Sequence, residues 1–108
     1  MKVYRTIFVC LIILQSGFVF GQNYITIEGM VYDEYNYPIP YASVGIVAKN
    51  IGTSSTEDGG FKFVVTNNEL SDTIEISSIG FQSFKITVQD FITLTDKSFV
   101  LKEMITEL

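Results

Sequence analysis

The sequence contains no histidine and no tryptophan, only two prolines, and a single cysteine, Cys10. Without histidine, the chain cannot build Ser-His or Cys-His nucleophiles or a His-ligated zinc site. Two carboxylate pairs remain, Asp33-Glu34 and Glu57-Asp58, but a glycosidase needs a sugar-lined cleft around such a pair, and a small domain has little room for one. The same acids supply only fragments of a calcium-binding loop. We therefore expect no enzymatic activity, no cofactor and no metal site.

The lone cysteine lies inside an apolar run near the N-terminus. Lys2 and Arg5 precede the uninterrupted apolar residues 7–14, and small residues end the segment at Gly21. This order is typical of a secretory signal peptide, and the run is too short to span a membrane. Because Cys10 lies within the run and not after it, we exclude lipid attachment there. We predict a signal peptide over residues 1–21 and a mature chain without a thiol, which packing alone must hold together.

The predicted mature chain, residues 22–108, has 87 residues and is strongly acidic. It keeps five lysines against twelve Asp and Glu residues, a net charge of −7. This length suits one domain with a modest core. An acidic surface excludes nucleic acid and anionic membrane as partners, because both require faces rich in Lys and Arg.

Apolar and polar residues alternate with a period of two through most of this chain, which indicates strands with one buried face. Turn signals separate these segments at 33–40, 50–52, 57–60, 67–72 and 79–80. We predict an all-β fold over residues 22–103, an antiparallel Greek-key sandwich of about seven strands. One helical turn fits at 88–94. The alternating segments cover residues 25–33, 42–49, 61–66, 73–78, 84–88 and 97–102.

The two prolines and several glycines receive structural roles. Pro38 and Pro40 should hold residues 37–41 extended and direct the chain into a strand at Ala42. Gly29 should allow a neighbouring backbone to approach. The remaining positions are turn residues that supply positive φ angles, at a hairpin and between two later strands: Asp58, Gly59, Gly60 and Gly80.

Four segments occur in an order that resembles a known family: GMVYD, PIPYASVGI, GTSSTEDGGFKF and DTIEISSIGFQS. They resemble the carboxypeptidase regulatory-like domain, a transthyretin-like (prealbumin-like) β-sandwich of exported proteins in Gram-negative bacteria. The resemblance covers residues 25–101. It implies a non-catalytic accessory role in docking, folding support, or ligand or glycan binding at the cell envelope, in the periplasm, at the outer membrane or on the cell surface.

Tyrosines gather around the first long loop. Exposed aromatic rings can stack on sugars or fill a partner's pocket, whereas buried rings would instead seal the end of the sandwich. We predict that this loop is the partner-facing patch, for a protein partner, for other domains of a longer chain, or for carbohydrate. Its members are Tyr32, Tyr35, Asn36, Tyr37 and Tyr41.

An alternative function is kept open. Similar domains form N-terminal extensions of TonB-dependent outer-membrane receptors, which take up nutrients. In residues 104–108 an alternating pattern restarts at Met104 and Ile105. The alternative therefore interprets this tail as the start of a missing region that would associate with the outer membrane.

Overall fold

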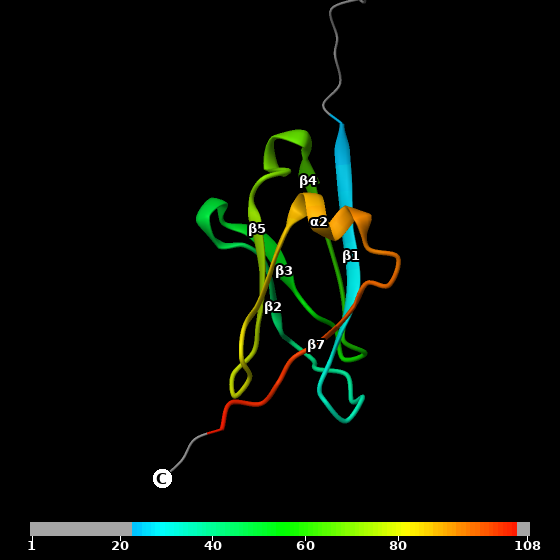
Figure 1. Ribbon diagram of the computed structural model, residues 1–108, viewed down its shortest axis with the longest axis vertical. Helices are drawn as coiled ribbons and strands as arrows, with labels where there is room; N and C mark the ends of the chain where they lie inside the picture. Colours follow the sequence, from blue (N-terminus) through cyan, green and yellow to red (C-terminus); the bar gives the residue numbers. More distant parts are fainter. Residues whose placement is uncertain (1–22, 106–108) are drawn as a thin grey trace, which may run out of the picture.

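The structure, a computed structural model, describes residues 23–105. The predicted signal peptide at 1–21 and the last three residues of the predicted tail lie outside this range. Two sheets face each other: a three-stranded sheet in the order β4-β1-β7 and a four-stranded sheet in the order β3-β2-β5-β6 (Figure 1). The strands are β1 (Tyr24–Tyr32), β2 (Ser43–Ile46), β3 (Ile51–Ser54), β4 (Gly60–Thr66), β5 (Thr73–Ser77), β6 (Phe84–Thr87) and β7 (Ser98–Val100), and the helical elements are η1 (Val47–Lys49), η2 (Asn67–Glu69) and α2 (Val88–Thr93).

The alternating segments form strands because one face of each is apolar and is buried between the sheets. In β1 the buried residues are Ile27 and Val31, and in β5 they are Ile74 and Ile76. The predicted all-β sandwich is therefore confirmed, as is the helical turn after β6, which is α2. The other buried apolar residues are Ile39, Ala42, Val44, Ile46, Phe61, Phe63, Val65, Val88, Phe91, Phe99 and Leu101.

One strand pair departs from the antiparallel prediction. β1 pairs antiparallel with β4, with Gly29 opposite Phe61, but it pairs parallel with β7, with Val31 opposite Phe99. A parallel pair requires a long crossover connection between its two strands, and here all the elements from β2 to α2 lie between β1 and β7 in the chain. Phe99 thereby enters the core, where its ring centroid lies 5.5 Å from that of Phe91.

The structure corrects two predictions for the region around β2 and β3. The strand predicted over 42–49 ends at Ile46, and Val47–Lys49 form a 3₁₀ turn that ends at Asn50 with a φ of 55°. Of the turn predicted at 50–52, only Asn50 lies in a turn; Ile51 and Gly52 instead begin β3, which pairs antiparallel with β2. The turn lies three residues earlier because Asn50 adopts the left-handed conformation that asparagine tolerates.

Three glycine predictions are confirmed and one is corrected. A Cβ atom on Gly29 would lie 2.6 Å from the carbonyl oxygen of Lys97, so the close backbone approach is real. Gly59 and Gly80 have positive φ angles of 83° and 89°, but Gly60 does not and instead begins β4, and Asp58 has no positive φ either. However, the turn at Asp58, Gly59 and Gly60 is not a hairpin within one sheet, because it joins β3 of the four-stranded sheet to β4 of the three-stranded sheet.

Candidate functional site

The loop after β1 is fixed by one carboxylate. Asp33 Oδ1 accepts hydrogen bonds from the backbone N–H groups of Tyr35, at 2.8 Å, and Tyr37, at 2.9 Å. The Asp33 N–H donates to the Tyr37 carbonyl at 2.9 Å, and Asn36 takes a positive φ of 66°. An aspartate that bonds amides two and four residues later is a local clamp. We call residues 33–37 the tyrosine loop.

The prolines after this loop act differently from each other. Pro38 is extended and forms an isolated bridge with Tyr32, as predicted. Pro40 and Tyr41 instead form a turn, and Tyr41 has a φ of 58°. The prediction that residues 37–41 are extended throughout is therefore wrong at its end. Proline favours the first central position of a turn, and the positive φ falls on Tyr41, the residue after it.

A buried hydroxyl holds this second turn. Ser55, which is 2% exposed, accepts a hydrogen bond from the Ala42 N–H at 2.8 Å and donates one to the Ile39 carbonyl at 2.7 Å. The backbone of Ser55 also bonds that of Ala42 and accepts from the Tyr41 N–H. Sequence reasoning missed Ser55, because its partners are 13 and 16 residues away and no local pattern marks it.

The tyrosine side chains point outward from these fixed backbones. Tyr35 is 72% exposed, and Tyr37 and Tyr41 are each 68% exposed, whereas Tyr32 is half-buried. The alternative, that the tyrosine rings are buried and seal the end of the sandwich, is therefore wrong for Tyr35, Tyr37 and Tyr41. Tyr35, Asn36 and Tyr37 share one loop. Tyr41 borders a separate hollow, with Ser43, Ser77, Ser78 and Ile79.

The C-terminal end of the described chain is attached to the same end of the sandwich. The Glu103 N–H donates to Glu34 Oε1 in the tyrosine loop at 3.3 Å. The Gln82 N–H donates to the Lys102 carbonyl, and the Met104 N–H donates to the Gly80 carbonyl. The strand pattern predicted to restart at Met104 is therefore a short bridge centred on Glu103. Figure 1 shows this end opposite the start of β1.

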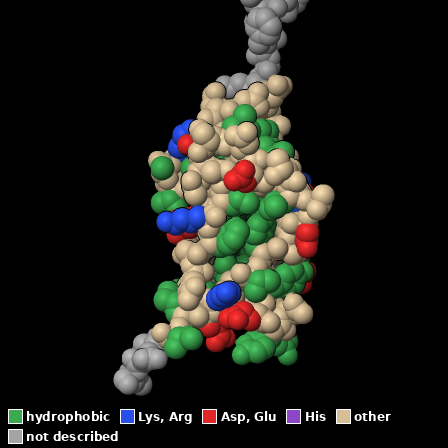
Figure 2. All heavy atoms as spheres, in the orientation of Figure 1, with side chains coloured by type: hydrophobic (Ala, Val, Ile, Leu, Met, Phe, Trp, Pro, Cys, Tyr) green, Lys and Arg blue, Asp and Glu red, His purple; other side chains and the backbone are tan. Residues whose placement is uncertain are grey.

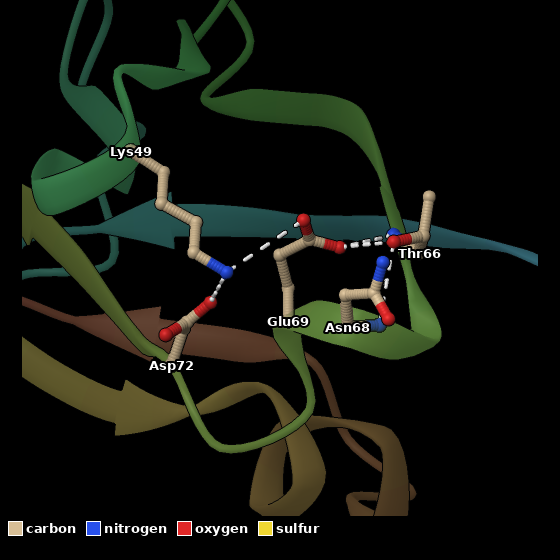
Figure 3. Close-up of polar contacts among 5 residues, drawn as sticks. All are labelled: Lys49, Thr66, Asn68, Glu69 and Asp72. Atoms are coloured by element: carbon tan, nitrogen blue, oxygen red, sulfur yellow. Dashed lines mark hydrogen bonds and ion pairs between the residues drawn. The ribbon is translucent and has the colours of Figure 1, made fainter.

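A charged cluster lies elsewhere, where η1 meets the β4–β5 connection (Figure 3). Lys49 Nζ lies 2.6 Å from Asp72 Oδ2 and 3.8 Å from Glu69 Oε1. Glu69 Oε2 accepts hydrogen bonds from the Thr66 N–H at 2.7 Å and the Thr66 hydroxyl at 2.5 Å, which forms a capping box for η2.

The two pKa shifts in this cluster have clear causes. The Asp72 carboxylate raises the pKa of Lys49 above its usual range, mainly through their hydrogen bond. The hydroxyl of Thr66, followed by the Thr66 N–H, lowers the pKa of Glu69. Both shifts favour the charged forms. The cluster is therefore an ion pair joined to a helix cap.

An apolar face completes the surface features. Figure 2 shows hydrophobic side chains gathered in the middle of one face, below the position that α2 has in Figure 1. Where β6 and β7, the edge strands of the two sheets, approach each other, the half-exposed Phe84 of β6 has its ring centroid 5.3 Å from that of Phe99 in β7. This contact between two edge strands closes the core laterally.

Within 23–105, no three or more His, Cys, Asp or Glu residues gather in a way that could hold a metal ion. No helix in that range is both long enough and apolar enough to cross a membrane.

Comparison with known proteins identifies a family for most of the chain. Residues 27–108 match the family model of the CarboxypepD_reg-like domain. No curated protein and no solved structure matches the chain.

Proposed function

The chain belongs to the CarboxypepD_reg-like domain family, a family of non-catalytic β-sandwich domains, and from this we propose that it is an exported accessory domain that docks onto a protein partner at the cell envelope. The docking surface in this proposal is the tyrosine loop. One observation carries it: two tyrosine rings are largely exposed on a backbone that Asp33 clamps.

Rigid, exposed tyrosines suit docking for an energetic reason. A tyrosine ring offers a large contact area and has only two rotatable χ angles, so ordering it costs little entropy. Here the backbone is also ordered in advance, because the amides of Tyr35 and Tyr37 are already bonded to Asp33. Preordered loops bind more tightly than mobile ones that make the same contacts.

The negative charge of the chain limits which partners it can bind. The predicted mature chain carries a net charge of −7, and Glu34 lies exposed in the tyrosine loop itself. Complementary charge around an aromatic contact speeds association and excludes wrong partners. The proposed partner therefore has a surface that is neutral or basic around the pocket that accepts the rings.

The experiment compares how much of the partner a double variant of the tyrosine loop and a single control variant recover from the source cells. The double variant Tyr35→Ser/Tyr37→Ser should recover less of the partner by co-purification, with an unchanged melting temperature. Tyr24→Ser is the matched control, because Tyr24 is 71% exposed at the start of β1. Equal recovery by the double variant and the control would contradict the proposal. A parallel loss of melting temperature in the double variant would assign the rings to stability instead.

Export is tested separately by the intact mass of the product in fractionated cells. The proposal expects a species that begins at Gln22 in an envelope or secreted fraction, and a cytoplasmic species that retains residues 1–21 would contradict it. The receptor-extension alternative stays a prediction. In that case, the bond between Glu34 and Glu103 would bring a following domain close to the tyrosine loop.

A further inference from the structure

Three serines form a row across the outer face of the four-stranded sheet. Ser43 of β2 stands opposite Ser54 of β3 on one side and opposite Ser77 of β5 on the other. The neighbouring residue Val44 points the other way, into the core. Because adjacent strands lie about 4.8 Å apart, the row is about 10 Å long. No hydrogen bond from these hydroxyls to another described residue is present, so they are free to bond a ligand.

Next to this row β2 and β3 carry no side chains, while β5 presents Glu75 opposite Gly45. Gly45 and Gly52 face each other across β2 and β3. A Cβ on Gly52 would lie 2.5 Å from the Val44 carbonyl oxygen, so close backbone packing explains these glycines without a ligand. The surface that they leave beside Ser43 is backbone, exposed at Gly52 and buried at Gly45.

Two hollows meet at Ser43; Ser77 borders one of them, and Ser54 borders neither. One, of about 350 Å³, is bordered by Tyr41, Ser43, Ser77, Ser78 and Ile79. The other, of about 330 Å³, runs along β2 and β3 from Ser43 past the two glycines to Asn50. Ser43 borders both, so they form one trough. No charged side chain borders either hollow.

Tyr41 forms the aromatic wall at one end of the trough. Its φ of 58° is a conformation that glycine or asparagine adopts with less strain. The turn nevertheless carries a tyrosine whose ring is mostly exposed. A large exposed ring at a position that favours a small residue is difficult to explain by stability alone.

We propose that this trough binds a neutral oligosaccharide, with Tyr41 stacking on a sugar ring and with Ser43 and Ser77 bonding its hydroxyls. Sugars present apolar ring faces and many neutral hydroxyl groups, and the trough offers an aromatic ring and neutral hydroxyls. An anionic ligand is disfavoured because the chain is acidic and the trough has no cation. The site lies outside the tyrosine loop and does not depend on the proposed docking function.

The test is a titration of the ¹⁵N-labelled chain, residues 22–108, with maltoheptaose, cellohexaose and xylohexaose in turn. At least one should shift the amide signals of residues 41–54 and 77–79. Tyr41→Asn should weaken that sugar's affinity about tenfold or more, because the ring is lost, while the melting temperature stays constant or rises, because asparagine relieves the strain. Ser43→Ala should weaken binding to a smaller degree.

Two control variants test whether the sugar binds in the trough and not at another surface. Ser98→Ala removes an exposed serine from β7 in the opposite sheet, and Tyr35→Ser removes a ring from the tyrosine loop; both should leave sugar affinity unchanged. The proposal is overturned if none of the three sugars shifts the trough signals at 10 mM, or if Tyr41→Asn binds as tightly as the wild type. Loss of binding in Tyr35→Ser but not in Tyr41→Asn would also overturn it.

Discussion

The hydroxyl oxygen of Ser55 lies 2.8 Å from the amide nitrogen of Ala42, and it connects that amide to the carbonyl of Ile39. In an ordinary β-turn, the amide of the fourth residue bonds the carbonyl of the first directly. Here a side chain from the segment after β3 is inserted between them. The turn that presents Tyr41 is thus held by a residue far away in sequence, and its geometry depends on the assembled fold.

Ser55→Ala should therefore destabilise the domain. The substitution leaves a buried N–H and a buried carbonyl without their partner, which typically costs about 1–3 kcal/mol in the free energy of unfolding. Urea denaturation of the variant measures this loss. Ser54→Ala is the control, because its side chain is exposed and should change stability little. Equal effects of the two substitutions would show that the bridge contributes nothing.

Gly29→Ala should also destabilise the fold, through overpacking. The new Cβ would lie 2.6 Å from the Lys97 carbonyl oxygen and 2.8 Å from Cζ of Phe61, and relief of such contacts costs about 1–3 kcal/mol. Gly80→Ala serves as a comparison, since no atom lies within 4 Å of its Cβ and only its positive φ opposes the change. We expect the larger decrease in melting temperature for Gly29→Ala. The reverse order would contradict the close approach of β1 and Lys97.

The Glu69 carboxylate should contribute a pH-dependent part of the stability. Its pKa is lower in the folded chain than the usual 4.5, so its ionised form stabilises the fold above that pH. The contribution is lost as the pH falls through the lowered pKa. Glu69→Gln should therefore be less stable than the wild type at pH 7, and the difference should shrink toward pH 3.

The charge of Lys49 does not change over the pH range of this test. Its pKa is raised, so its contribution is complete below the usual 10.5 and is lost only as the pH rises through the raised value. Between pH 3 and 7 the lysine therefore stays charged, and the change in stability reports the carboxylates. Urea unfolding of Glu69→Gln and the wild type across this range gives the result. A difference that is constant with pH would rule out the carboxylate charge as its source.

The strands with a fully apolar face could be predicted from the sequence. In β4, Phe61, Phe63 and Val65 alternate with exposed residues, and this period identifies a strand without any tertiary knowledge. β3 was not predicted, because Ile51 and Gly52 look like turn residues when only their neighbours are considered. Their strand conformation comes from pairing with β2, where Gly52 fits against Gly45.

Long-range contacts at the candidate sites could not be predicted from local sequence patterns. The loop tyrosines could be identified from composition, and the clamp by Asp33 is local enough to follow from its position. The turn at Tyr41 was missed, because the residue before it, Pro40, also fits an extended chain. Likewise, the pairing of Lys49 with Asp72 and of Glu34 with Glu103 joins segments that only the folded sandwich brings together.

Site-specific crosslinking would test the central claim, that the tyrosine loop is the docking surface, most directly. A photo-crosslinking amino acid replaces Tyr37 in one strain and Tyr24 in another, and both strains are irradiated as intact cells. The account predicts a discrete crosslinked species for position 37, which mass spectrometry identifies as one envelope protein, and none for position 24. Crosslinks at position 24 but not at 37, or the same species at both, would contradict it.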